Sequence, residues 1–203
     1  MKLFCSLLLM IPCVFGQGPK MADGLYAVFA TSEGNFTAKL YEKETPRSVE
    51  NFVALAEGTK AWKDPRTHAM VKRPLYDNLE FYRVMPGEMI QSGSATGSTG
   101  SDCGVNVRDE FLPGLMFDRA GKLAVANSGG PDSGGCQFFI TASPMRTWDG
   151  KYAIFGMVVK GLDVVQKIAT APAHDEKPLA PVKLLSVSIM RIGPEPVVKS
   201  KKK

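Results

Sequence analysis

Residues 81–93 read FYRVMPGEMIQSG and combine two short apolar stretches with isolated polar residues. Side chains alternate between the two faces of a strand, so Phe81, Arg83 and Met85 are expected to share one face. Arg83 therefore stands among apolar neighbours. Taken alone, the stretch is most simply interpreted as a core strand that carries an exposed polar residue.

Two later stretches have the same character. Residues 123–129 read LAVANSG and residues 134–141 read GGCQFFIT. Each is a short apolar strand with one or two polar side chains, and each by itself has the same simple interpretation. Their significance comes from occurring together and in this order.

The N-terminal part of the chain predicts a hairpin followed by a helix. Apolar alternation around a Gly-Asn turn predicts strands over 25–31 and 36–41. Thr45 is expected to be the N-cap of the helix, with Pro46 in the first turn, where its missing N–H costs nothing. Gly58 is expected just beyond the helix end. One apolar stripe follows the helical period, formed by Val49, Phe52, Val53 and Ala56.

The rest of the chain alternates short apolar strands with loops rich in Gly, Ser and Asp, the longest at 92–104. Strands are expected over 79–85, 89–91, 123–127, 137–141, 153–159 and 184–192. A second helix is expected over 162–169. Many short strands with two helices predict a mainly β fold, a closed antiparallel barrel with helical plugs. Strict alternation of strands and helices is absent, which disfavours a parallel doubly wound sheet.

Several common kinds of active site are missing from the sequence. There is no G-x-S-x-G motif, no lysine after the glycines of residues 92–104, and no H-E-x-x-H or paired C-x-x-C. The two histidines, His68 and His174, lie in polar, loop-like stretches. An enzyme built from this chain would therefore need a reaction that uses no metal, no nucleophile and no histidine base. We expect no cofactor.

Together, the three stretches resemble the signature of the cyclophilins, a family of peptidyl-prolyl isomerases. That signature reads F-H-R-V-I-P-G-F-M-x-Q-G-G, then A-N-A-G-P-x-T-N-G-S-Q-F-F-I, then W-L-D-G-K-H-x-V-F-G. The matching residues here are 81–93, 126–140 and 147–156, and the helix at 46–58 resembles the first helix of the family. The resemblance extends from Tyr26 to Ile192. It implies a closed eight-stranded antiparallel β-barrel capped by two α-helices, which agrees with the pattern of strands.

The resemblance also implies roles for individual residues. Arg83 falls on the catalytic arginine of the family, and Gln91 on the glutamine that helps to hold it. Met89, Ala126 and Phe139 fall on the apolar proline pocket. The remaining substrate-binding positions implied by the resemblance are Tyr82, Asn127, Gln137, Trp148 and Tyr152.

Five features depart from the family pattern. Tyr82 and Tyr152 replace two histidines, Thr147-Trp148 replaces Trp-Leu, and residues 128–134 differ in sequence. The fifth is Glu88, which replaces an aromatic residue of the pocket wall. Its carboxylate would either pair with Arg83 and compete with substrate, or point to solvent and favour a basic residue near the proline.

The implied function is acceleration of rotation about X-Pro bonds during protein folding. Such rotation breaks no σ-bond, which fits the absence of nucleophile and metal motifs. The partners would be proline-containing unfolded or flexible polypeptides. The alternative is a module on the same fold that binds proline-containing peptides with little turnover, an interpretation that Glu88 and the altered wall favour.

The charge of the chain gives little reason to expect a nucleic-acid partner. The net charge is +5, but Lys2 and the four lysines of the C-terminus account for five of the 25 basic residues, leaving 20 basic against 20 acidic. The excess lies in a tail at 194–203, which is expected to be solvated.

The N-terminus predicts a secretory signal. Lys2 precedes a short apolar run that ends in small or medium residues at Val14 and Gly16, which is typical of a leader cleaved after Gly16. The run is too short to span a membrane. A periplasmic or secreted protein is expected, or a cytoplasmic one if translation starts at Met21. The expected organisation is a signal at 1–16, a linker at 17–24, the isomerase domain at 25–193 and the tail.

Removal of the leader would leave two cysteines, Cys103 and Cys136. An oxidising compartment would permit a disulfide between them, and two isolated buried thiols are the alternative. Nothing in the sequence indicates an oligomer, so a monomer is expected.

Overall fold

The computed structural model describes residues 21–100 and 103–195. The predicted leader and all but the first two residues of the predicted tail lie outside these ranges. The strands are β1 (Gly24–Thr31), β2 (Gly34–Leu40), β3 (Trp62–Lys63), β4 (Met70–Val71), β5 (Leu79–Glu80), β6 (Arg83–Met85), β7 (Met89–Ser92), β8 (Lys122–Val125), β9 (Phe138–Thr141), β10 (Ile154–Lys160), β11 (Ala173–His174), β12 (Lys177–Pro178) and β13 (Lys183–Ile192). The helices are α1 (Pro46–Ala56), the 3₁₀ helix η1 (Arg146–Trp148) and α2 (Leu162–Ala169). None of the described helices is long and apolar enough to cross a membrane.

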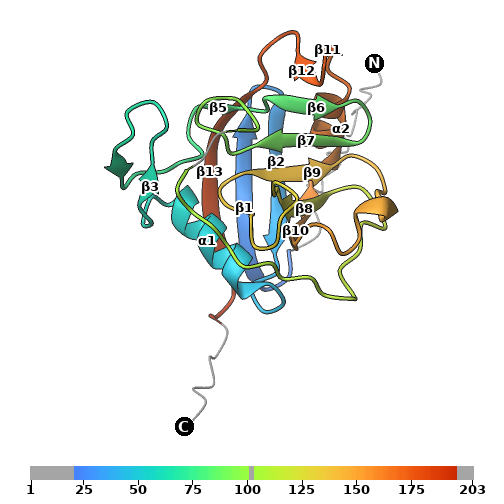
Figure 1. Ribbon diagram of the computed structural model, residues 1–203. Helices are drawn as coiled ribbons and strands as arrows, with labels where there is room; N and C mark the ends of the chain where they lie inside the picture. The colour runs from blue at the N-terminus through green and yellow to red at the C-terminus, as the bar shows by residue number, and fades with distance from the viewer. Residues whose placement is uncertain (1–20, 101–102, 196–203) are drawn as a thin grey trace, which may run out of the picture.

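Nine of the strands form one curled antiparallel sheet, in the order β5-β13-β1-β2-β10-β8-β9-β7-β6 (Figure 1). The mainly β fold with two α-helices is thereby confirmed. The expected closed barrel of eight strands is corrected in two respects. The sheet has nine strands, because the single strand predicted over 79–85 is two, and it is an open curled sheet, because its edge strands β5 and β6 are not paired with each other. At Phe81 the backbone N–H donates to the Val182 carbonyl at 2.9 Å, whereas the next strand, β6, pairs with β7. The chain therefore changes partner at this point, and the two edge strands are consecutive in sequence.

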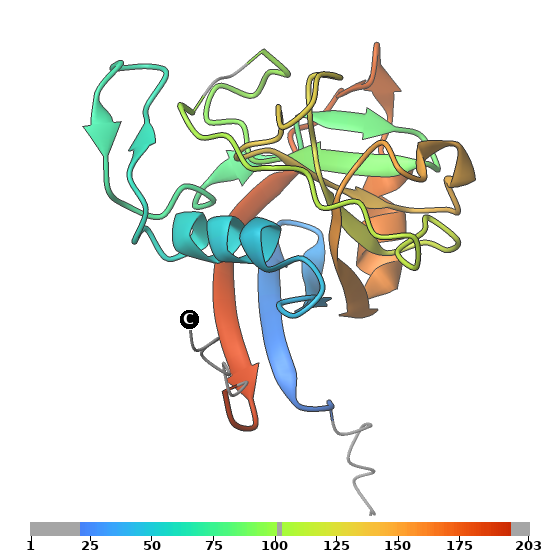
Figure 2. The ribbon, with the colours of Figure 1, turned by 60° about the horizontal axis from the view of Figure 1, so that its bottom comes forward.

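The two helices lie against different parts of the sheet, with strands between them in both views (Figures 1 and 2). Phe52 of α1 is buried at the centre of an aromatic cluster, with its ring centroid 5.0–6.0 Å from four neighbours. The four neighbours are Phe29, Tyr76, Phe138 and Phe155. Each buried aromatic ring removes a large apolar area from water, so this one side chain fastens α1 to three strands and a loop. On α2 the buried residues are Val165, Ile168 and Ala169.

The ends of α1 are only partly as expected. Pro46 is the first helical residue, and Gly58 follows the end with a positive φ of 70°, so both predictions are confirmed. Thr45 is the N-cap residue, as predicted, but its side chain makes no cap hydrogen bond, because its hydroxyl donates to the Tyr41 carbonyl. The cap comes from Glu110, whose carboxylate accepts hydrogen bonds from the backbone N–H groups of Arg47 and Ser48 at 3.1 and 2.9 Å.

We expect Glu110→Ala to lower the free energy of unfolding by about 1–2 kcal/mol, the usual cost of losing an N-cap. The reason is that two N–H groups of the first turn lose their acceptor and a negative charge leaves the positive end of the helix dipole. Urea denaturation measures the change. The matched control is Glu50→Ala, which removes an exposed carboxylate of the same helix and should change stability by less than about 0.5 kcal/mol. Equal effects of the two substitutions would contradict the assignment of Glu110 as the cap.

Candidate active site

A groove of about 580 Å³ lies over β6, β7 and β9 and reaches the end of β8. Its lining includes every residue that the sequence predicted for the site except Tyr82. These residues are Arg83, Met89, Gln91, Ala126, Asn127, Gln137, Phe139, Trp148 and Tyr152. Thr99, Asn106, Ser128 and Ser133 also line the groove but were not predicted as site residues, although Ser128 and Ser133 lie in the stretch at 128–134 that departs from the family signature.

The register of the sheet brings the central residues together. Arg83 pairs with Gln91 across β6 and β7, and Gln91 pairs with Phe139 across β7 and β9. Directly paired residues of neighbouring strands project on the same face of a sheet. Their sequence neighbours Ile90 and Ile140 project to the other face and are fully buried in the main core. One face of these strands therefore belongs to the core and the other to the groove.

The apolar side of the groove is built around Phe139. The rings of Trp148 and Tyr152 meet it edge to face, with centroids 5.3 and 5.1 Å away. Met89 and Ala126 belong to the same apolar cluster, which is separate from the main core. Trp148 thus contributes its indole to the pocket wall, although it is displaced by one position from the tryptophan of the family signature.

The polar side of the groove contains the guanidinium of Arg83, whose side chain is one-third exposed. Its Nη1 donates to Gln91 Oε1 at 3.1 Å, and its Nη2 lies 3.6 Å from the sulfur of Met85. Its Nε donates to a carboxylate oxygen of Glu176 at 2.5 Å. Among the described residues, no ion pair joins Arg83 to Glu88, and Glu88 is not among the groove-lining residues. Of the two alternatives given for Glu88, pairing with Arg83 is therefore not observed. The carboxylate beside Arg83 belongs to Glu176.

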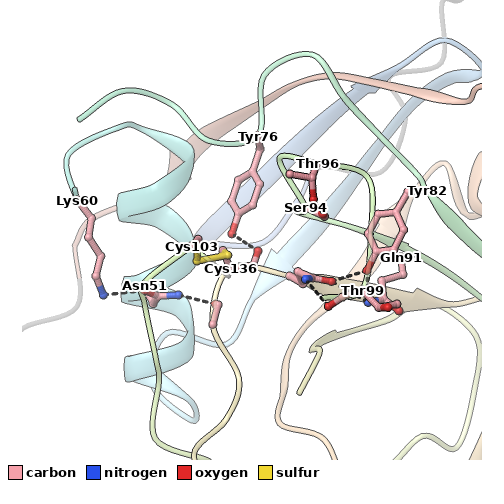
Figure 3. The surroundings of a disulfide bond; sticks show 12 residues. Asn51, Lys60, Tyr76, Tyr82, Gln91, Ser94, Thr96, Thr99, Cys103 and Cys136 are labelled. Carbon is pink, nitrogen blue, oxygen red and sulfur yellow. Dashed lines mark hydrogen bonds between the residues drawn. A yellow bond between two sulfur atoms is a disulfide. The ribbon is translucent and has the colours of Figure 1, made fainter. Parts of the chain in front are cut away.

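Tyr82 lies behind Gln91 and is buried. Its hydroxyl accepts a hydrogen bond from Gln91 Nε2 and donates one to Gln137 Oε1. Gln137 Nε2 in turn donates to the Thr99 carbonyl at 3.1 Å (Figure 3). Burial raises the pKa of Tyr82 well above its usual range, so the hydroxyl keeps its proton and remains a donor. The tyrosine thus belongs to a chain of amide and hydroxyl groups that ends at Arg83.

Asn127 sits at the rim of the groove. Its side-chain Nδ2 donates to the Lys151 carbonyl at 2.9 Å, and its Oδ1 accepts from the Gly129 N–H at 3.2 Å. The amide therefore ties the segment after β8 to the loop that carries Tyr152. Among the described residues, no cluster of three or more His, Cys, Asp or Glu side chains is arranged to hold a metal ion.

A disulfide joins Cys103 to Cys136 beside the groove, and both residues contribute to its lining (Figure 3). The segment around Cys136 is also held by two side chains of the core. Asn51 of α1 donates to the Gly135 carbonyl at 2.9 Å, and the Tyr76 hydroxyl donates to the Cys136 carbonyl at 3.0 Å. Of the two alternatives that the sequence left open, the structure contains the bonded pair.

Comparison with known proteins agrees with this geometry. The family model for the cyclophilin type peptidyl-prolyl cis-trans isomerases matches residues 26–189. The chain belongs to this family. As a cyclophilin, it is a peptidyl-prolyl cis-trans isomerase.

Curated relatives cover most of this cyclophilin. Peptidyl-prolyl cis-trans isomerase B of Streptomyces anulatus is 39% identical over 173 residues, which are 83% of this chain and 98% of the relative. Peptidyl-prolyl cis-trans isomerase A of Mycobacterium tuberculosis is 37% identical over 166 residues, 80% of this chain and 91% of the relative. A cyclophilin-type isomerase of Cryptosporidium parvum, crystallised in the presence of the dipeptide Ala-Pro, superposes with a TM-score of 0.70 at 27% identity. That superposition covers 82% of this chain and 99% of the other.

We expect loss of the disulfide to lower the free energy of unfolding by about 3–4 kcal/mol, because the bond closes a long loop in the unfolded chain. The two cysteines are separated by 33 residues. Urea denaturation of the wild-type protein with and without a thiol reductant measures the change. The variant Cys103→Ala/Cys136→Ala is the control, and its midpoint should not respond to the reductant. A wild-type midpoint that also fails to respond would show that the bond contributes no stability.

Proposed function

We propose that this cyclophilin catalyses prolyl isomerisation by donating a hydrogen bond from Arg83 to the proline nitrogen of the twisted amide. Rotation about an X-Pro bond must lose amide resonance, against a barrier of about 18–20 kcal/mol. As the amide twists, its nitrogen becomes pyramidal and gains a lone pair. A donor that meets this lone pair binds the transition state more strongly than either planar ground state, and this difference accelerates the rotation.

The contacts of Arg83 support this role. A guanidinium has five N–H donors and stays charged at every physiological pH. Among residues 21–100 and 103–195, Glu176, Gln91 and Met85 engage one donor on each of the three nitrogens, which leaves two of the five N–H donors for a substrate. Because the side chain is only one-third exposed, the donor acts in a partly dry site, where a charged hydrogen bond counts for more than in water.

The apolar wall is suited to hold the pyrrolidine ring. Phe139, Trp148 and Tyr152 present ring edges and faces, and Met89 supplies an adaptable apolar side chain beside them. With the ring held there, the chain on the other side of the bond is the part that rotates. Asn127 and Gln137, at the rim and on the polar side, are proposed to contact the substrate backbone. The clients are proposed to be proline-containing unfolded or flexible polypeptides.

We expect wild-type protein to accelerate cis/trans exchange of an Ala-Pro tetrapeptide, measured by NMR exchange spectroscopy. Arg83→Ala should lower kcat/KM by about 100-fold or more, because the donor to the nitrogen is lost. Arg83→Lys should recover only a small part, since an ammonium cannot reproduce the planar fork.

The matched control is Arg119→Ala, which removes an exposed arginine that does not line the groove and should leave the rate unchanged. If the wild type binds the tetrapeptide but leaves its exchange rate unaltered, the protein is a proline-peptide-binding module and the proposed catalysis is wrong.

We further propose that the protein acts as a monomer outside the cytoplasm. Two observations favour export: the leader-like residues 1–16, and the Cys103–Cys136 disulfide, a bond that persists in oxidising compartments and is rare in the cytosol. One chain supplies all the residues proposed for the site, so the proposed activity requires no second copy.

Mass spectrometry of the protein purified from its natural source tests the export proposal. We expect a mature chain that starts at Gln17 and gains about 2 Da on reduction of its one disulfide. A chain that starts at Met21 with both thiols free would contradict export. Native mass measurement of the same sample reports the oligomeric state.

A further inference from the structure

Glu176 contacts the strand of the catalytic arginine in two ways. It lies in the two-residue turn between β11 and β12, a hairpin that runs beside β6 (Figure 1). Its backbone carbonyl accepts the Val84 N–H at 2.7 Å, and its carboxylate accepts the Arg83 Nε–H at 2.5 Å. One residue of the hairpin therefore holds both the backbone and the side chain of β6.

The backbone at this turn does not favour a glutamate. Asp175 and Glu176 both have positive φ, at 49° and 62°. Two-residue hairpin turns of this kind prefer Asn-Gly or Asp-Gly, because a side chain with a Cβ is strained in the left-handed region. A residue held in such a conformation is maintained by its surroundings. The turn alone would be better served by glycine at 176, so the value of the glutamate must lie in its carboxylate, and the ion pair recorded for that carboxylate is with Arg83.

We propose that Glu176 is a positioning residue for Arg83, an inference that rests on the proposed role of this arginine. The guanidinium is planar, so two acceptors at different nitrogens determine both its plane and its rotation. Glu176 holds Nε and Gln91 holds Nη1, and Gln91 itself lines the groove. The remaining Nη donors then face the groove before substrate arrives, and less conformational freedom is lost during the reaction.

Glu176 contributes more by orienting the Arg83 guanidinium than by Coulombic attraction to it. The side chains of Arg83 and Glu176 are 33% and 41% exposed, so water and salt weaken their Coulombic attraction. A hydrogen bond to a fixed acceptor keeps its directionality under these conditions. The opposite hypothesis makes a different prediction. If the Glu176 carboxylate competes with substrate for the Arg83 guanidinium, its removal should raise activity.

Glu176→Gly separates the carboxylate from the fold. Glycine fits a φ of 62° and keeps the carbonyl that accepts from Val84, so the hairpin should persist and Tm should stay the same or rise. We expect kcat/KM for the Ala-Pro tetrapeptide to fall about tenfold, the scale of one hydrogen bond to a charged group. The Kd of the peptide should change less than about twofold, because the apolar pocket that holds the proline ring is untouched.

Two further variants distinguish orientation from charge and from general damage to the hairpin. Glu176→Gln keeps an acceptor oxygen and should restore kcat/KM to within about threefold of wild type, since a neutral acceptor can still hold Nε–H. Asp175→Asn removes a charge from the same turn, where the Asp175 side chain is 91% exposed and does not touch Arg83, and should leave kcat/KM unchanged.

A spectroscopic measurement reports the contact without reference to catalysis. In wild-type protein the Arg83 Nε–H resonance, assigned by its disappearance in Arg83→Lys, should exchange slowly with water and stand apart from those of exposed arginines. In Glu176→Gly it should move toward them and exchange faster, while in Glu176→Gln it should stay near its wild-type position.

Each outcome decides the proposal. An unchanged or raised kcat/KM in Glu176→Gly overturns it, and a rise assigns Glu176 as a competitor of substrate. An equal loss in Glu176→Gln with an intact fold also overturns it, because charge and not orientation would then matter. If the wild type itself fails to accelerate exchange, the proposed function fails, and the Nε–H resonance still tells whether Glu176 holds Arg83.

Discussion

The alternation of side chains across three adjacent strands is the constraint on which the rest of this molecule depends. In β6, β7 and β9 one face enters the main core through Val84, Ile90, Phe138 and Ile140, and the other face lines the groove through Arg83, Met89, Gln91 and Phe139. Ile90 and Ile140 anchor the strands from one side. Because side chains alternate along a strand, Gln91 and Phe139 must then project from the opposite face, into the groove. A slip of one residue in either strand would exchange the core with the groove, so stability and function select the same register.

Within the groove, the apolar and polar halves are held by different physical means. Phe139 and its edge-to-face partners form a wall by packing, which is tolerant of small shifts. The guanidinium of Arg83 is held by directional hydrogen bonds that extend through Gln91 and Tyr82 to Gln137. Tyr82 can take the place of a histidine here because a buried phenol both donates and accepts. The substitutions at Tyr82, Trp148 and Tyr152 therefore leave the groove with an apolar half of packed rings and a polar half that contains the Arg83 guanidinium.

The parts of the structure that sequence could predict are those determined by neighbours along the chain. Strand alternation, the position of Pro46 and the glycine at 58 depend on a few consecutive residues, and the structure bears them out. The family signature predicted which distant residues meet in the groove, but contacts of residues outside that signature were not predictable. Glu110 caps a helix more than sixty residues away, and Glu176 reaches an arginine 93 residues before it. Glu88 was considered as a partner of Arg83 because its position in the family signature belongs to the pocket wall, but pairing in space is set by the hairpin at 173–178. The same holds for the break between β5 and β6, which arises from a change of partner strand that no local pattern encodes.

That break has a consequence for an isomerase whose family acts on proline-containing peptides. Exposed strand edges invite other chains to add to a sheet, and extended clients are well suited to do so. Here the two outermost strands have two and three residues and follow one another directly in the chain. The outer side of β6 is covered in part by the hairpin, through the bond from the Val84 N–H to Glu176. At the β6 edge, which borders the groove, an extended peptide therefore meets a short, partly covered strand and a groove lined by side chains. This edge offers an extended peptide little backbone to pair with, so contact beside β6 is left to the side chains of the groove.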